Sequence, residues 1–91
     1  MGSRSPVEHR NAVGILLRTL RLESGMTQAE LATKLGRAQS YVSKFESREL
    51  GLDVLELREV CIAIGTTLDA FVARLEKELK AIGPGTRPQR L

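Results

Sequence analysis

The amino-acid sequence predicts one all-α domain built from five helices. Apolar residues recur three and four positions apart through most of the chain, which is the spacing of a buried helix face. Two capping boxes, Thr27-x-x-Glu30 and Asp53-x-x-Glu56, each mark the start of a helix, and glycines stand where the helical patterns stop. With 91 residues the chain has the length of one small domain, and its pattern contains no strand and no internal repeat.

The first helix is expected over about Glu8–Ser24, where Gly25 stops it. Its buried stripe is expected to consist of Val13, Leu16, Leu17 and Leu20. The folded domain as a whole is expected to span residues 8–82. Residues 1–7 then form a flexible segment, and residues 83–91, rich in glycine and proline, form a disordered tail.

Two short helices joined by a tight turn are predicted next. Thr27 caps the first of them, Gln28–Leu35, and Gly36 suits its end because only glycine adopts a left-handed conformation cheaply. The second helix, Gln39–Glu46, follows Ala38. Because Ala38 replaces the usual Ser or Thr cap, this helix starts without a side-chain acceptor, at a cost of about 1 kcal/mol.

The helix Gln39–Glu46 has an apolar inner face and a polar outer face. Val42 and Phe45, three residues apart, are expected to turn inward. The outer face carries Gln39, Ser40, Ser43 and Lys44. A polar outer face on a rigid apolar base is what a helix needs in order to enter the DNA major groove.

A fourth helix is expected from its Asp53 cap to Ile64, and a fifth, capped by Thr67, over residues 68–82. The core face of the fourth helix is expected to consist of Leu57, Val60, Cys61 and Ile64. Cys61 is the only cysteine, so an internal disulfide is excluded, and with a single histidine in the chain a zinc site is not expected. No metal or other cofactor is predicted.

Charge and hydropathy narrow the class of protein. The net charge of +3 is a mild bias that is compatible with a nucleic-acid partner. No apolar run has the length of a membrane span and no secretory signal leads the chain, so a cytoplasmic protein, nucleoid-associated when bound to DNA, is expected. The sequence has no glycine-rich phosphate loop, no metal cluster and no nucleophile beside a base, so an enzyme is not expected.

The two-helix stretch resembles the helix-turn-helix of the Cro and phage-repressor type, also called XRE-like. Gln28 opens the first helix, Ala32 occupies the close helix crossing and Gly36 fills the turn. The apolar positions of the family's recognition helix match Val42 and Phe45. The resemblance covers about residues 10–75 and implies a five-helix, repressor-like DNA-binding domain whose C-terminal helix is extended. The alternative is an αα-hairpin of a helical bundle with no DNA role.

The resemblance also implies which residues read bases. The family's base-contacting positions match Gln39, Ser40 and Lys44, and Ser43 lies on the same face. A glutamine can bond adenine at N6 and N7, and a lysine can donate to guanine at O6 or N7. For each of these residues the alternative is a solvated polar side chain on a helix surface.

Phosphate contacts are expected around this polar face. Gln28 stands at the first turn of its helix, where its amide and free backbone N–H groups can hold a phosphate, and it matches the family's backbone-anchoring position. Arg37 and Arg48 add positive charge, as does Lys44, and Tyr41 is expected to offer its hydroxyl to a phosphate. Arg48 stands where close family members often have glycine, so the loop after the recognition helix is expected to differ in shape.

One pair of charges within the scaffold follows from the resemblance. Arg21 and Glu46 match positions that form a partly buried ion pair in several family members. Such a pair would fix the angle between the first helix and the recognition helix. The alternative is two solvated surface charges.

The fifth helix carries an apolar stripe with the 4-3-4-3 spacing of a coiled-coil seam. The stripe consists of Leu68, Val72, Leu75, Leu79 and Ile82. Leu68 and Val72, with Phe71 beside them, are expected to pack on the first helix inside the monomer. Leu75, Leu79 and Ile82 are expected to form a homodimer interface, since a domain of this type is complete by about residue 75 and the stripe beyond it would otherwise be exposed.

The sequence thus predicts a sequence-specific double-stranded DNA-binding protein that acts as a dimeric transcriptional regulator, a repressor or an autoregulator, on a two-fold symmetric operator. The alternative is a protein-interaction module, such as an antitoxin, that uses the same fold to cover a protein partner. No membrane partner is expected.

Overall fold

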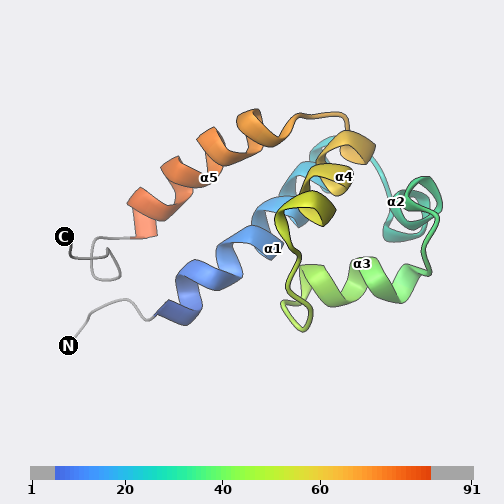
Figure 1. The fold of residues 1–91 in the computed structure, drawn as a ribbon, viewed down its shortest axis with the longest axis horizontal. Coiled ribbons are helices and arrows are strands. Elements are labelled where there is room, and N and C mark those ends of the chain that lie inside the picture. The colour runs from blue at the N-terminus through green and yellow to red at the C-terminus, as the bar shows by residue number, and fades with distance from the viewer. Residues whose placement is uncertain (1–5, 83–91) are drawn as a thin grey trace.

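The structure, a computed structural model, describes the backbone of residues 6–82 and the side chains of residues 11–81. Within that part the fold consists of five α-helices without strands, which confirms the predicted fold class (Figure 1). The helices are α1 (Pro6–Glu23), α2 (Gln28–Leu35), α3 (Gln39–Glu46), α4 (Val54–Ile64) and α5 (Leu68–Ile82). The predicted disordered tail lies outside the described residues, as do the first five residues of the predicted flexible segment.

The first helix begins two residues earlier than the sequence indicated, at Pro6 instead of Glu8. Proline is well suited to a first helical turn, because its missing N–H has no partner there and its φ angle is already helical. The helix ends at Glu23, and Gly25 follows with a left-handed φ of 76°. The N–H of Met26 then donates to the carbonyl of Arg21 at 3.1 Å, which closes the last turn.

Local sequence signals determine the ends of α2, α3 and α4. In the Thr27 capping box the two reciprocal hydrogen bonds measure 3.0 and 2.9 Å, and in the Asp53 box they measure 2.7 and 2.9 Å. Gly36 and Gly65 end α2 and α4 with φ angles of 68° and 102°. Ala38 provides no side-chain hydrogen bond to the start of α3, as its sequence predicts.

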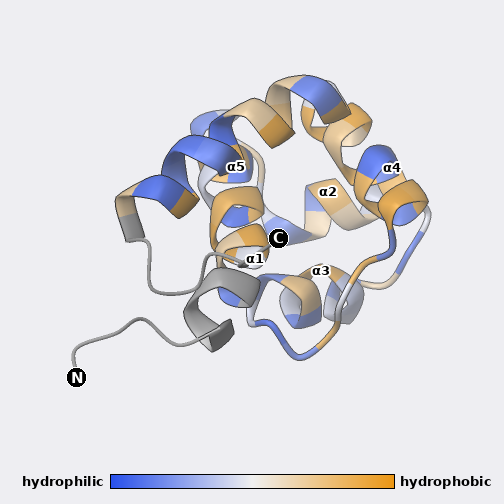
Figure 2. Ribbon diagram, turned by 60° about the vertical axis from the view of Figure 1, so that its left-hand side comes forward, coloured by the Kyte–Doolittle hydropathy of each residue, from blue (hydrophilic) through white to orange (hydrophobic). Residues whose placement is uncertain are grey.

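The core lies where the inner faces of all five helices meet, while each helix ribbon alternates between hydrophobic and hydrophilic residues (Figure 2). Its buried members are Leu16, Leu17, Leu31, Ala32, Val42, Phe45, Val60, Cys61, Ile64 and Phe71. Cys61 is fully buried, and this burial raises the pKa of its thiol. It therefore acts as a small core residue.

Helix α1 packs against both α3 and α5, which lie on opposite sides of it (Figures 1 and 2). On the α3 side the two backbones approach closely at Gly14, which is buried. A Cβ atom at Gly14 would lie 2.5 Å from the carbonyl oxygen of Phe45. Only glycine permits this approach, so Gly14 sets the distance between α1 and the recognition helix.

On the α5 side the predicted division of the apolar stripe is partly wrong. Phe71 is buried and Leu68 packs on the core, but Val72 is 42% exposed, whereas the sequence placed it inside the monomer. Leu75, predicted for a dimer interface, packs against the core cluster, and Leu79 is half-buried. The reason is rotational: because Phe71 points into the core, the next residue is turned about 100° away from it. The Ile82 side chain lies outside the described residues.

None of the described helices is long and apolar enough to cross a membrane.

Candidate nucleic-acid interface

The outward face of α3 presents a continuous row of polar side chains. Ser40, Ser43, Lys44 and Ser47 follow one another at helical spacing, and all four are exposed. Ser47, directly after the helix, extends the exposed polar row and is a further candidate that the sequence did not indicate. Its position seven residues after Ser40, two turns along the same face, is the signal that identifies it. Its hydroxyl lies 3.2 Å from the carbonyl oxygen of Lys44.

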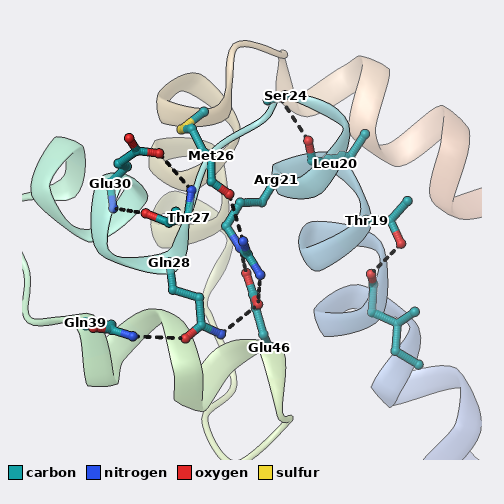
Figure 3. Close-up of polar contacts among 11 residues, drawn as sticks. Thr19, Leu20, Arg21, Ser24, Met26, Thr27, Gln28, Glu30, Gln39 and Glu46 are labelled. Atoms are coloured by element: carbon teal, nitrogen blue, oxygen red, sulfur yellow. Dashed lines mark hydrogen bonds and ion pairs between the residues drawn. The ribbon is translucent and has the colours of Figure 1, made fainter.

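Behind this face, Arg21 of α1 and Glu46 of α3 form the ion pair that the resemblance implied. The Arg21 Nε and one terminal nitrogen donate to the two carboxylate oxygens at 2.6 and 2.9 Å (Figure 3). The two side chains are only 7% and 3% exposed, and Arg21 also donates to the Met26 carbonyl at 2.8 Å. The hydrogen bond to Glu46 raises the pKa of Arg21. This bidentate geometry fixes α3 against α1.

Two glutamines link the Glu46 carboxylate to the protein surface by hydrogen bonds. The Gln28 amide nitrogen donates to Glu46 Oε1 at 3.1 Å, and the Gln28 amide oxygen accepts from the Gln39 amide nitrogen at 3.4 Å (Figure 3). A carboxylate can only accept, so the Gln28 nitrogen must face Glu46 and its oxygen must face Gln39. The buried pair therefore determines which way round the amide nitrogen and oxygen of both glutamines point. The sequence could not reveal this connection, because it joins residues from three helices.

The opposite flank of α3 carries an aromatic stack. The Arg37 guanidinium lies over the Tyr41 ring, 4.1 Å from its centroid, and the Tyr41 and Phe45 rings meet edge to face at 5.4 Å. Burial raises the pKa of Tyr41; Arg37 opposes the shift, and the carboxylates of Glu56, Glu59 and Asp53 add to it. The Tyr41 ring therefore supports the Arg37 guanidinium, while a phosphate contact from the Tyr41 hydroxyl stays a prediction.

Arg48 follows α3 with a left-handed φ of 72°, and it is the one non-glycine residue with a positive φ in the described part of the chain. Arg37 and Arg48 are both exposed, as are all four predicted base-reading residues, while Gln28 is half-buried. Of the predicted site residues, the structure joins Gln28 of α2 to Gln39 of α3 and Arg37 to Tyr41, while the Arg48 stem lies against Gly14 of α1. No group of three or more His, Cys, Asp or Glu residues among the described ones is arranged to hold a metal ion.

A family model for the helix-turn-helix matches residues 17–71, which is more than half of the chain. The chain belongs to the helix-turn-helix family. An XRE-family-like protein from Pseudomonas syringae pv. tomato is 44% identical to it, with 78% of this chain and 87% of that chain covered and a TM-score of 0.72. A comparison with curated proteins gives no match.

Two regulators of known structure are also similar to this helix-turn-helix protein. The restriction-modification controller protein C.Esp1396I is 27% identical, with 85% of this chain and 99% of that chain covered and a TM-score of 0.75. The clp gene regulator ClgR from C. glutamicum is 27% identical, with 78% and 92% covered and a TM-score of 0.71. Since this family consists of DNA-binding regulators, the helix-turn-helix chain is a DNA-binding transcription regulator and not an enzyme.

Proposed function

We propose that the chain binds a two-fold symmetric operator sequence-specifically as a homodimer, with α3 in the major groove. The observation that carries this proposal is the hydrogen-bonded path from the buried Arg21–Glu46 pair through Gln28 to Gln39. It holds a surface amide in one orientation before DNA arrives, which is the preorganisation that base reading requires.

Gln39 is proposed to read an adenine. One N–H of its amide is engaged by Gln28, and the side chain is exposed, which leaves its carbonyl oxygen and its second N–H for a base. An oxygen that accepts from adenine N6 and an N–H that donates to N7 form the bidentate contact that glutamine makes with this base. Lys44, one turn further along the outer face, is proposed to donate to a guanine, with Ser40 and Ser43 contacting bases between them.

Phosphate contacts are proposed on both sides of α3. Gln28 uses one amide N–H for Glu46 and retains the second, which lies at the start of α2 beside free backbone N–H groups. On the other flank Arg37, held over the Tyr41 ring, presents a guanidinium whose orientation is already restricted. Contacts on both flanks would fix the register of the helix in the groove.

The dimer is proposed to form through the C-terminal half of α5. Leu79 is half-buried, and Val72, seven residues earlier on the same stripe, is 42% exposed, so a partner copy can cover both. Leu75 supports this surface from beneath because it packs on the core. Ile82 would extend the stripe. The similar protein C.Esp1396I has been solved as a tetramer in complex with its natural 35 base-pair operator, which supports binding in more than one copy.

As a regulator of this kind, the chain is proposed to act in the cytoplasm as a repressor or autoregulator, by occupying its operator. A reporter gene placed behind an operator that the chain selects from random duplex DNA tests this role. Expression of the reporter should fall when the chain is supplied, and a rise would identify an activator instead.

The decisive experiment is selection of duplex DNA from a random-sequence pool by the purified chain, followed by gel shift at low and high salt. We expect a consensus with two-fold symmetry whose half-sites lie about one DNA turn apart. Gln39→Ala should lower affinity for the selected operator about tenfold or more, and should remove the preference at one adenine in each half-site. Arg58→Ala, a change at an exposed position of α4, serves as the control and should leave the consensus unchanged. A pool that yields no consensus would refute sequence-specific binding and favour the protein-interaction module.

A further inference from the structure

The outward face of α4 carries three of the seven exposed large apolar side chains in the described part of the chain. Val54, Leu55 and Ile62 are 64%, 72% and 54% exposed. The opposite face of α4 already packs into the core, through Val60 and Cys61 among others. A surface helix needs only one apolar face in order to fold against its own domain. The second apolar face of α4 therefore suits a contact outside the domain.

Two opposite charges lie between the apolar positions of this outward face. Leu55 and Ile62 are seven residues apart, or two helical turns, so they lie along one line of the helix. Arg58 and Glu59 are both exposed, and they lie about 50° to either side of that line. The face thus consists of an apolar line with one positive edge and one negative edge.

The apolar surface continues from α4 toward α2. An open groove between these two helices is lined by Lys34, Leu35, Glu59, Ile62 and Ala63. Leu35 and Ala63 are half-buried, so they add apolar surface beside Ile62. A partner that covers the line on α4 can therefore also cover part of this groove.

Two copies of this face complement each other when their α4 helices lie parallel about a two-fold axis. Residues on the apolar line then meet their own counterparts, so Leu55 packs on Leu55 of the other copy and Ile62 on Ile62 of the other copy. The rotation brings the positive edge of each copy against the negative edge of the other. Arg58 of each copy therefore faces Glu59 of the other, and two ion pairs flank the apolar contacts. In an antiparallel arrangement each edge would meet the same edge, and like charges would face each other.

We propose that α4 is a second self-association surface, through which two copies pair in parallel about a two-fold axis. The inference goes beyond the proposed α5 dimer because it uses another face: α2 and the C-terminal half of α5 lie at opposite ends of the molecule (Figure 1). A chain with two such surfaces can join dimers into a tetramer or a longer assembly. The α4 contact covers only two helical turns of each copy, so it requires a higher concentration than an interface of standard size.

The test reverses the charge of each edge and follows association by sedimentation velocity over a range of chain concentrations. Arg58→Glu makes both edges negative and Glu59→Arg makes both positive, so like charges would face each other on both flanks. Each variant should weaken the step that joins dimers about tenfold or more. The double variant exchanges the two edges, so it should associate as the unaltered chain does. Arg18→Glu, a charge reversal at an exposed position of α1, is the matched control and should leave association unchanged.

Mixing the two single variants provides a second measurement. An equimolar mixture of Arg58→Glu and Glu59→Arg chains should form the assembly that neither forms alone, because each negative edge then meets a positive one. Thermal melting monitors folding, and all variants should melt close to the unaltered chain because both positions are exposed.

Unchanged association in both single variants would overturn the pairing through α4, as would an unaltered chain that forms nothing larger than the α5 dimer. Failure of both the double variant and the mixture to restore association would overturn the parallel arrangement. The α5 dimer is tested separately by Leu79→Glu. An assembly that survives Leu79→Glu but not Arg58→Glu would support the α4 contact and contradict the α5 dimer.

Discussion

Helix α1 contacts α3 and α5 through the same pair of residue types in two different environments. Arg21 and Glu46 join α1 to α3 with side chains 7% and 3% exposed, whereas Glu23 and Arg74 join α1 to α5 with side chains 54% and 40% exposed. Both pairs are bidentate, with hydrogen bonds of 2.6 and 2.9 Å in the first and 3.0 Å for each bond in the second. Their chemistry is equal, but their burial is not.

The difference in burial separates a rigid contact, between α1 and α3, from a more exchangeable one, between α1 and α5. The buried pair cannot exchange its partners for water, so it fixes the recognition helix against α1. Through hydrogen bonds it also orients the side chains of Gln28 and Gln39. The exposed pair can exchange its partners for water at little cost. The α5 side also has exposed apolar surface at Val72, which we propose a second copy covers, while the α3 side carries the exposed polar groups that we propose contact DNA.

The largest effect is expected from Glu46→Ala, which leaves the Arg21 guanidinium buried without its carboxylate. The free energy of unfolding should fall by about 3–5 kcal/mol, measured by urea denaturation. Glu49→Ala, which removes an exposed carboxylate three residues later, is the control and should cost less than about 0.5 kcal/mol. A loss below about 1 kcal/mol for Glu46→Ala would mean that the pair is solvated in solution.

The second-largest loss of stability is expected from Gly14→Ala, at the contact between α1 and α3. Alanine ordinarily favours a helix over glycine, but here its Cβ would lie 2.5 Å from the Phe45 carbonyl oxygen. Stability should therefore fall by about 2 kcal/mol, and operator affinity should fall with it because α3 is displaced. The neighbouring Ile15→Ala, at a side chain 52% exposed, should change both quantities little. A stabilised Gly14→Ala protein would contradict the close approach of the two helices.

On the α5 side, Leu79→Glu should act on association more than on folding. A charge placed in the apolar stripe should raise the dimer dissociation constant about thirtyfold or more, as measured by analytical ultracentrifugation, while the monomer still melts cooperatively. Leu55→Glu, at a side chain 72% exposed on α4, is the matched control. Dissociation caused by Leu55→Glu and not by Leu79→Glu would move the interface from α5 to α4.

The smallest effect is expected from the exposed pair. Hydrogen bonds from Arg74 lower the pKa of Glu23, so this pair contributes stability above the ordinary pKa of glutamate and loses it as the pH falls through the lowered value. Glu23→Gln should shift the melting temperature only slightly at neutral pH, and the difference should vanish in strong acid. A shift as large as that of Glu46→Ala would show that exposure does not distinguish the two pairs.

The sequence predicted what depends on near neighbours along the chain. The Thr27 and Asp53 boxes, Gly36 and the uncapped Ala38 all act within one helical turn, so they revealed the bounds of α2 and α3 and the number of helices. The polar outer face of α3 could be predicted for the same reason, since its residues share one short helix. Ser47 extends this exposed face, but it follows the last helical residue, so the helical pattern did not include it.

Other features depend on how helices rotate against one another. A 4-3-4-3 spacing identifies a stripe on α5, but it does not say which edge of the stripe faces α1. Val72 is therefore exposed where the sequence placed it inside the monomer, and Leu75 packs on the core. Arg48 posed the same problem: the sequence identified an arginine in place of glycine, and only the packed structure placed its stem on Gly14.

The sequence by itself therefore determined the five helices, their caps and the family of the protein, because these depend on residues within one or two helical turns. Only the tertiary structure decided that Glu46 is shared by Arg21 and Gln28, and that Gln28 in turn orients Gln39. These partners lie 11 to 25 positions apart in the chain. Their hydrogen bonds form only where the hydrophobic core brings three helices together and excludes water.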